Sequence, residues 1–258
     1  MKVTILGCGT SVGVPALGRA GWGRCDPAEP RNRRMRCALL VQTDETNILV
    51  DAGPDIREQL LPHQLRKIDA LLITHTHSDH ISGLDDLRAF YWPDQIKIPV
   101  YASAIHGADI QTRFPYLFEK KESSPSYFKP PMEMHQLEAG EKLSIGDVQI
   151  ECFFQQHGKG FSHGFVFNDK CAYSTDVSHL EAAVLQRLHQ IPLWVVETLR
   201  PETHEAHAHY EQTFDWLAQV QPDQAYLTHL GLEADYQTLL ALCPDKTEPA
   251  YDGLQINL

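Results

Sequence analysis

Long apolar segments are absent from the sequence, and so are the signals of export. No stretch of about 18 apolar residues occurs, so we expect no membrane-spanning segment. The opening "MKVTILGCG" lacks the apolar core of a signal peptide and is typical of a strand followed by a glycine turn. The sequence therefore predicts a cytoplasmic protein.

Closely spaced cysteine pairs are also absent. None of the six cysteines forms a C-x-x-C pair, and several lie in apolar, strand-like contexts such as "CALLV" and "IECFF". These contexts favour buried free thiols in a reducing compartment over a framework of disulfides.

Positive charge is scarce. The 22 Lys and Arg residues face 34 Asp and Glu residues, which gives a net charge of −12. An acidic surface repels a polyanion at long range, so long nucleic acid is an unlikely partner. The stretch "PRNRRMR" is the exception, and it is either a solvated basic turn or a source of phosphate contacts; its basic residues are Arg31, Arg33, Arg34 and Arg36.

Linkers and low-complexity tracts are missing as well. No clean G-x-G-x-x-G opens a helix, so the glycine-rich loop near the N-terminus is no dinucleotide fingerprint. The chain of 258 residues has 43% hydrophobic content, which allows a substantial core. We expect a single domain over residues 1–258.

Apolar runs and turn residues predict alternating strands and helices. Strands are expected at 2–7, 37–43, 46–53, 68–74, 98–103, 142–156, 164–169, 171–176, 192–198, 224–229 and 254–258. Helices are expected at 54–65, 83–92, 179–191, 210–220 and 235–243, and a helix followed by an irregular insertion at 104–135. This pattern favours an α+β fold of two sheets packed face to face with helices outside, and polar residues mark several strand ends, where sites are built.

The segment "ITHTHSDHISG", residues 73–83, gathers three histidines and an aspartate directly after a buried strand. His75 and His77 lie two apart in a turn, where both rings can face one point, and Asp79 and His80 follow at the start of a helix. Imidazole and carboxylate together suit zinc, manganese or iron. The string predicts a metal site.

The string "HTHSDH" followed by "SGL" resembles the signature of the metallo-β-lactamase fold superfamily. Further residues match that pattern in order: Asp51 in "ILVDAG", His157 in "FQQHGKG", Asp176 in "YSTDV" and His229 in "AYLTHL". The resemblance covers nearly the whole chain. It implies an αββα sandwich of two mixed β-sheets flanked by helices.

The resemblance also implies a ligand set for two divalent cations, Zn²⁺ or Mn²⁺. One cation takes His75, His77 and His157; the other takes Asp79, His80 and His229; Asp176 bridges them. A bridging hydroxide formed near neutral pH would then be the nucleophile, and Asp79 counts among the catalytic groups as well as the ligands. Asp51 is expected to orient a ligand histidine, with a turn-capping role as the alternative.

The N-terminal motifs "LGCGTSVGVP" and "RNRRMRCALLV" resemble the phosphodiesterase branch of this superfamily, closest to the cyclic phosphodiesterases of the carbon–phosphorus lyase pathway. The implied substrate is a small, possibly cyclic phosphodiester. His209, in "AHAHYEQTFDWL", matches a histidine of that branch and is assigned to a phosphoryl oxygen or to protonation of the leaving alkoxide. His207 and His204 are rival candidates.

The chain departs from those phosphodiesterases at their structural zinc site. Only Cys25 remains of the cysteine cluster, and the partnering histidine is absent after His229, where the chain reads "LGLEAD". We therefore expect no third metal. A thioesterase or lactonase, a tRNA-processing nuclease and a metal-binding biosynthetic helper remain as alternatives, and relatives suggest a homodimer.

Overall fold

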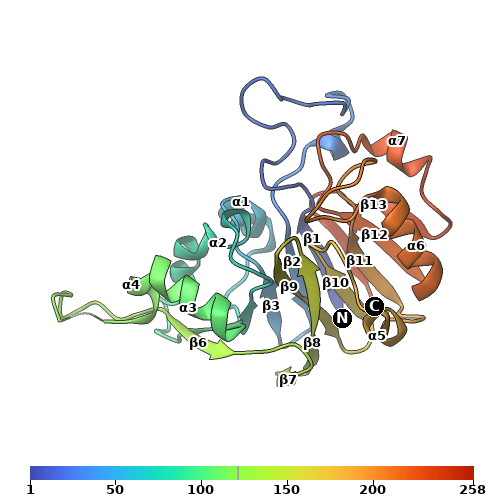
Figure 1. Ribbon diagram of the computed structural model, residues 1–258. Helices are drawn as coiled ribbons and strands as arrows, with labels where there is room; N and C mark the ends of the chain where they lie inside the picture. Colours follow the sequence, from blue (N-terminus) through green and yellow to red (C-terminus); the bar gives the residue numbers. More distant parts are fainter. Residues whose placement is uncertain (121) are drawn as a thin grey trace.

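Two seven-stranded sheets pack face to face at the centre of the computed structural model, which describes residues 1–120 and 122–258 (Figure 1). The first sheet has the order β14-β1-β2-β3-β4-β5-β6 and is antiparallel up to β3 and parallel from β3 to β6. Its strands are β1 (Lys2–Gly7), β2 (Ala38–Gln42), β3 (Asn47–Val50), β4 (Ala70–Leu72), β5 (Ile98–Ala102), β6 (Met132–Gln136) and β14 (Leu254–Asn257).

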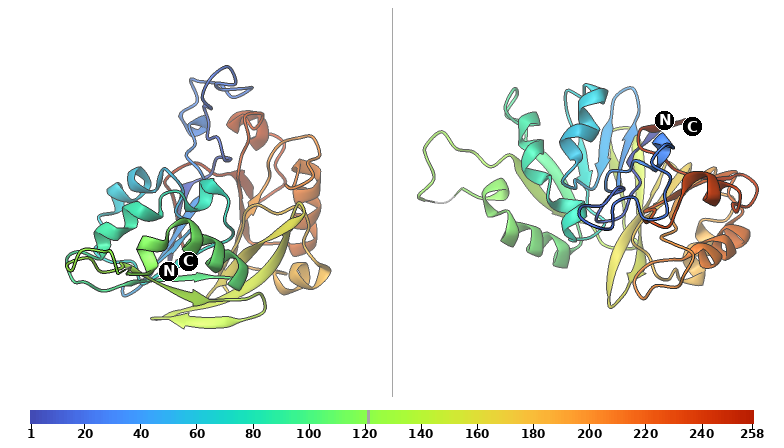
Figure 2. Two further views of the ribbon diagram at one scale, coloured as in Figure 1. Left: turned by 60° about the vertical axis from the view of Figure 1, so that its left-hand side comes forward. Right: turned by 90° about the horizontal axis from the view of Figure 1, so that it is seen from above.

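The second sheet has the order β13-β12-β11-β10-β9-β8-β7 and is parallel from β10 to β13. Its strands are β7 (Lys142–Ile145), β8 (Val148–His157), β9 (Gly160–Phe167), β10 (Cys171–Ser174), β11 (Leu193–Glu197), β12 (Gln224–Thr228) and β13 (Thr247–Pro249). The two chain ends meet beside the sheets, where the Met1 amino group donates to the Leu258 carbonyl over 2.9 Å (Figure 2).

Helices cover the outer face of each sheet (Figures 1 and 2). The first sheet carries α1 (Ile56–Leu60), α2 (Ser78–Ile81), α3 (Ala104–Arg113), α4 (Pro115–Phe118) and the 3₁₀ helices η2 (Leu61–His63) and η3 (Leu84–Phe90). The second carries α5 (Ala182–Arg187), α6 (Tyr210–Val220) and α7 (Tyr236–Leu240), and η1 (Pro30–Asn32) lies in the N-terminal loop. The predicted α+β fold, an αββα sandwich of two mixed sheets flanked by helices, is confirmed.

The central strands of the first sheet, β2, β3 and β4, are apolar on both faces, and both faces are buried. In β2, Leu39 and Val41 belong to the core between the sheets, whereas Leu40 belongs to the core beneath the helices. In β3, Ile48 and Leu49 divide in the same way. This double burial explains why these strands appear in the sequence as continuous apolar runs without alternation.

Several element predictions were wrong in their bounds. The segment 142–156 contains two strands, because the chain turns at Gly146 with φ 56°. Strand β9 begins at Gly160, earlier than predicted, and β13 was not predicted. The segment 83–92 forms a 3₁₀ helix over Leu84–Phe90 instead of an α-helix.

The arginines of "PRNRRMR" are largely paired within the protein. Arg31 makes a bidentate contact with Glu29 and stacks on Tyr236, with its guanidinium 3.8 Å from the ring centroid. Arg34 is buried and donates to Asn32, and Arg36 Nε lies 2.9 Å from Asp55. The stretch therefore anchors the N-terminal loop against the body of the fold and is not simply a solvated turn.

Five of the six cysteines are buried and all six are free, as the sequence predicted. Within the described residues, none of the helices is long and apolar enough to cross a membrane.

Candidate metal centre

Polar residues at the ends of six strands converge at one edge of the sandwich. From the first sheet, Asp51 follows β3, and the segment 73–80 follows β4. From the second sheet, His157 is the last residue of β8 and Glu197 the last residue of β11. Asp176 lies two residues past the end of β10, and His229 directly follows β12. Parallel strands end at a common edge, so each sheet delivers its residues to the same place.

Three of these residues have a left-handed backbone: Asp51 with φ 62°, Asp176 with φ 53° and His229 with φ 54°. Residues other than glycine adopt this conformation rarely, and where they do so the position is often a functional site. All three lie one or two residues past the end of a strand, where the chain leaves the sheet. The left-handed conformation is therefore part of how the protein positions these three side chains.

Two glycines allow α2 to lie close to the end of β3. A Cβ on Gly53 would lie 2.0 Å from the carbonyl oxygen of Asp79, and a Cβ on Gly83 would lie 2.0 Å from that of Gly53. The Ala52 amide donates to the His80 carbonyl over 2.7 Å. The glycines of "DAG" and "SG" therefore set the position of Asp79 and His80.

The first group of donor atoms comes from His75, His77, His157 and Asp176, and all of these atoms lie within 4.8 Å of one another. Nε2 of His157 lies 3.3 Å from Nδ1 of His77. Two nitrogens bound to one tetrahedral zinc at about 2.0–2.1 Å are separated by about 3.4 Å. The two histidines thus have the spacing of neighbouring ligands of one ion.

The second group comes from Asp79, His80, Asp176 and His229, again within 4.8 Å. Nε2 of His80 lies 3.2 Å from Asp79 Oδ2 and 3.1 Å from Asp176 Oδ2. Nε2 of His229 lies 3.5 Å from Asp176 Oδ1. Asp176 belongs to both groups, so its two oxygens can face two ions. The structure thus brings together all seven residues of the predicted ligand set.

The donor atoms also fit a metal by their chemistry. Nε2 of His75 and Nε2 of His229 are buried and have no hydrogen-bond partner among the described residues. A buried polar atom without a partner is costly, and ligation by a cation removes that cost. The residues present therefore fit divalent cations.

Contacts behind the ligands fix their orientation. Asp51 is fully buried, and its carboxylate lies 2.7 Å from Nδ1 of His80 and accepts from both the amide and the hydroxyl of Thr74 over 2.8 Å. Nδ1 of His157 donates to the Ala206 carbonyl over 2.7 Å. These contacts hold a proton on Nδ1 and leave Nε2 free for an ion. Asp51 thus occupies the orienting position that the sequence predicted.

Charges inside the cluster oppose the effect of burial. Burial alone would raise the pKa of Asp176, but His229, His80 and His75 outweigh it and hold that pKa well below its ordinary value. Burial would lower the pKa of His80, and Asp176 and Asp51 instead raise it well above the usual range. The pKa of His75 is lowered, first by burial and then by His80. Such opposed shifts are typical of a site built to hold charge.

Glu197 is the functional residue that the sequence prediction missed. It has no exposed surface, and its Oε1 lies 2.6 Å from Nδ1 of His207 and 2.8 Å from Nδ1 of His229. Its other oxygen accepts from the Val177 amide. Glu197 ends the apolar strand "LWVVE". An acidic residue at the end of an apolar strand also marks Asp51 and Asp176, and this pattern could have identified Glu197 from the sequence.

His207, and not His209, contacts the centre. The ring of His207 stacks on that of His229 at 4.8 Å, and its Nδ1 lies 3.9 Å from Asp176. His209 is the residue before α6, and its side chain has no hydrogen bond, ion pair or ring contact among the described residues. The spacing of "HAHY" does not distinguish the two rings, because both histidines stand before one helix and only the first contacts the centre.

A family model described as the Beta-lactamase superfamily domain matches residues 46–230. The chain belongs to this superfamily. The match covers both halves of the sandwich and every residue of the two donor groups.

Curated relatives of this superfamily member carry different names. The chain is 31% identical over 258 residues to an octanoyltransferase of Porphyromonas gingivalis, covering 99% of this chain and 51% of that protein. It is 31% identical over 144 residues to a ribonuclease Z of Bradyrhizobium sp., covering 54% of this chain and 46% of that protein. The chain thus spans about half the length of the curated relatives it matches.

Solved structures resemble the whole chain. A diphosphatase from the PhnP family is 28% identical with a TM-score of 0.88, and the alignment covers 100% of this chain and 97% of that one. Zn²⁺-bound PqqB from Methylobacterium extorquens is 18% identical with a TM-score of 0.78 over 100% of both chains and shares the fold. The predicted resemblance to the PhnP-like phosphodiesterase branch is supported by the first of these.

A cleft of about 240 Å³ opens beside the second donor group. The N-terminal loop contributes Thr10 and Ser11, and the segment after β11 contributes Arg200, His204 and His207. Cys25 Sγ lies 3.5 Å from the Leu232 carbonyl, so the N-terminal loop packs directly against the segment that follows His229.

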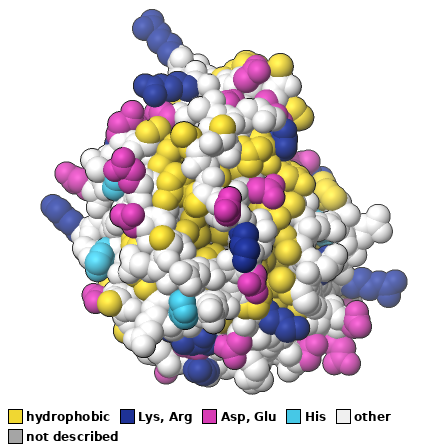
Figure 3. All heavy atoms as spheres, turned by 90° about the vertical axis from the view of Figure 1, so that its right-hand side faces the viewer, with side chains coloured by type: hydrophobic (Ala, Val, Ile, Leu, Met, Phe, Trp, Pro, Cys, Tyr) yellow, Lys and Arg dark blue, Asp and Glu magenta, His cyan; other side chains and the backbone are white. Residues whose placement is uncertain are grey.

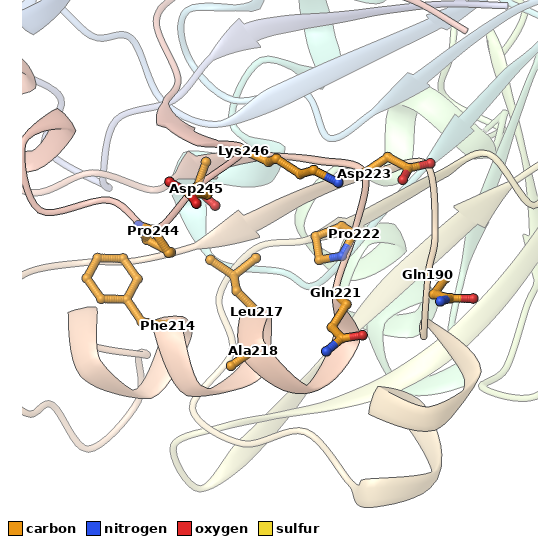
Figure 4. Close-up of a pocket in the computed structure, with 11 residues that line it drawn as sticks. Gln190, Phe214, Leu217, Ala218, Gln221, Pro222, Asp223, Pro244, Asp245 and Lys246 are labelled. Atoms are coloured by element: carbon orange, nitrogen blue, oxygen red, sulfur yellow. The ribbon is translucent and has the colours of Figure 1, made fainter.

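A larger hollow, of about 860 Å³, lies between α6 and the turn before β13 and shares no residue with the centre (Figure 4). The face that carries α6 and α7 shows hydrophobic atoms gathered among charged side chains (Figure 3). This hollow holds no cluster of the kind that binds metal, among the described residues.

Proposed function

We propose that the protein is a dimetal-dependent phosphodiesterase that hydrolyses a small, possibly cyclic phosphodiester. The observation that carries the proposal is the position of Asp176, shared between two donor groups, with the Glu197–His207 pair directly beside it. Two divalent cations held there supply Lewis-acid activation of water and of the phosphoryl group. Their charge attracts an anionic diester in spite of the acidic chain.

The protein's own residues then have distinct roles. His207 donates from Nδ1 to Glu197, so its Nε2 is free to give a proton to the leaving oxygen as the phosphorus–oxygen bond breaks. Asp79 is 8% exposed and Asp176 only 2%, so Asp79 is the aspartate that meets incoming water. The role first assigned to His209 passes to His207.

The similarities support chemistry at phosphorus. A diphosphatase cleaves a phosphoanhydride and a ribonuclease cleaves a phosphodiester, and both names occur among the proteins that this chain resembles. The octanoyltransferase name points to acyl chemistry, which makes a thioester a necessary comparison.

A substrate panel tests the proposal. Protein reconstituted with Mn²⁺ or Zn²⁺ is assayed on bis-p-nitrophenyl phosphate, 2′,3′-cyclic nucleotides, ribose 1,2-cyclic phosphate, a pre-tRNA and a thioester. We expect hydrolysis of the small diesters and little cleavage of the pre-tRNA, because a net charge of −12 repels a polyanion. Turnover of the thioester alone would contradict the proposal.

We also propose that the protein works as a homodimer in the cytoplasm, as its sequence resemblance suggests. Light scattering coupled to gel filtration measures the mass directly, and a mass near 29.2 kDa would contradict the dimer.

A further inference from the structure

Four rings form a continuous surface beside the metal centre, which we call the aromatic wall: Phe154, Phe161, His106 and His163. Phe161 lies in the middle. Its ring centroid is 5.7 Å from Phe154 with an interplanar angle of 22°, 4.6 Å from His106 at 28°, and 5.5 Å from His163 at 44°. Phe154 is 43% exposed and Phe161 is half-buried, so the stack has an open edge to solvent.

The wall is attached to the segments that carry the ligands. Phe161 pairs across the β8–β9 hairpin with Gln156, the neighbour of ligand His157. The His163 amide donates to the Thr74 carbonyl over 2.9 Å, directly before His75. Helix α3 carries His106, which stacks on Phe161, and its Arg113 donates to the Thr76 carbonyl over 2.8 Å. The wall is therefore anchored to the segments that carry the first donor group.

The two histidines of the wall are buried and pack on Phe161. His106 is 7% exposed and His163 is 1% exposed, yet Nδ1 of each has no hydrogen-bond partner among the described residues. Burial lowers the pKa of His163 to about 4 and also lowers that of His106, so both rings are neutral near pH 7. These two rings are covered and support Phe161, and the partly exposed rings of Phe161 and Phe154 form the surface that a ligand can reach. An uncharged planar surface of this kind suits a heteroaromatic ligand better than an alkyl chain.

The centre is thus flanked by two surfaces of different chemistry. The cleft on the side of the second donor group offers hydrogen-bonding side chains, among them Thr10, Arg200 and His204, and we call it the polar cleft. The wall on the side of the first donor group is aromatic. A diester or diphosphate has a substituent on each side of its phosphorus, so two unlike surfaces suit a substrate with two unlike arms.

Resting on the proposed function, we propose that the aromatic wall is a subsite for the base of a nucleotide-derived diester or diphosphate, whose other, sugar-like arm occupies the polar cleft. The base stacks on Phe161, and the phosphorus lies over the two donor groups. The wall thereby determines which diester is preferred.

Two readouts test this subsite. The first compares hydrolysis of ADP-ribose with that of the same diphosphate lacking the base. In Phe161→Leu, which keeps an apolar side chain but no planar face, we expect kcat/KM for ADP-ribose to fall by about 5- to 150-fold, the range for one base–aromatic stack, with no change for the base-free compound. Phe161→Tyr keeps the face and should restore the preference. Trp92→Ala removes an exposed ring that is 63% accessible and outside the wall, and should change neither.

The second readout needs no turnover, so it separates failure of the subsite from failure of the proposed function. Calorimetry of AMP and ribose 5-phosphate with metal-loaded protein should give a Kd for AMP that is 5- to 150-fold weaker in Phe161→Leu, with ribose 5-phosphate unaffected. Equal losses for both ligands, or none for AMP, would overturn the subsite even if bis-p-nitrophenyl phosphate is hydrolysed. Selective loss for AMP without any diester hydrolysis would support the subsite and count against the phosphodiesterase.

Discussion

Nδ1 of His207 lies 2.6 Å from Oε1 of Glu197, a carboxylate with no exposed surface. Burial would raise the pKa of Glu197, but His207 and His229 outweigh it and lower that pKa. One carboxylate thus orients a proposed proton donor and a proposed metal ligand together. Glu197 therefore links proton donation by His207 to metal binding by His229, and a substitution of His207 should affect the first without the second.

Replacing His207 by alanine should lower kcat by about 10²–10⁴-fold, because the leaving oxygen then lacks a proton donor. Metal content should stay unchanged, since the seven predicted ligands remain. His209→Ala is the matched control, because His209 lies two residues away and its side chain has no hydrogen bond, ion pair or ring contact in the described part of the chain; it should behave as wild type. Kinetics on bis-p-nitrophenyl phosphate with elemental analysis of each variant checks this. A large loss of kcat in His209→Ala with none in His207→Ala would assign proton donation to His209.

Asp51→Asn should weaken metal binding by about 10–100-fold, because the amide can no longer hold both Thr74 and His80 as the carboxylate does. The left-handed backbone at Asp51 tolerates asparagine, so the fold should persist. Titration of apo-protein with Zn²⁺ against a chelating indicator measures the affinity. A wild-type affinity for Zn²⁺ in Asp51→Asn would show that Asp51 only caps the turn and does not orient a ligand.

Removal of metal should destabilise the sandwich, because its donors come from both sheets. Binding at a thousandfold excess over Kd stabilises the folded state by about 4 kcal/mol, which for a chain of this size corresponds to roughly 8–16 °C in Tm. Calorimetric scans with and without chelator should show that shift for wild type and little for Asp176→Asn. An identical shift in the two proteins would argue against a cation at Asp176.

Asp252 should make stability depend on pH. Its carboxylate accepts from the amides of Cys8 and Met35, at 3.0 and 2.6 Å, and so closes the base of the N-terminal loop. Burial raises its pKa from 3.8 to about 7. The folded protein therefore keeps a proton that the unfolded chain releases near pH 4, and this contribution to stability is complete below pH 4 and lost as the pH rises through 7.

Urea denaturation of wild type and Asp252→Asn at intervals from pH 4.5 to 7.5 measures this contribution. The difference in unfolding free energy between the two proteins should change steadily with pH, by up to about 1.4 kcal/mol per pH unit. Other groups contribute equally to both proteins and cancel. A difference that stays constant with pH would place the pKa of Asp252 outside this window.

The two packed sheets and four of the seven donors follow local rules, whereas the family resemblance supplied His157, Asp176 and His229 as ligands. Apolar runs mark strands buried on both faces, and His75 to His80 lie in one short segment after such a run. The strand ends at Asp51, Asp176 and His229 repeat the same pattern.

Other features depend on contacts that spacing does not encode. The choice between His207 and His209 is made by the Glu197 carboxylate ten residues earlier, and nothing in "AHAHY" distinguishes the two rings. The aromatic wall joins α3 to the β8–β9 hairpin, about 55 residues apart, so its rings meet only in the folded chain. The pairing of the arginine stretch could not be predicted from its own residues, because Tyr236 and Asp55 lie outside it.

The positive φ at Asp51, Asp176 and His229 restricts how inert versions of this protein can be made. Asparagine and glycine accept such a conformation, whereas alanine or a β-branched residue would have to distort the main chain at the same moment as it deletes a functional group. If an alanine variant at one of these sites is inactive, the loss of the functional group cannot be separated from the displacement of neighbouring residues. Asparagine substitutions at these three sites are therefore the cleaner tools for capturing an uncleaved substrate.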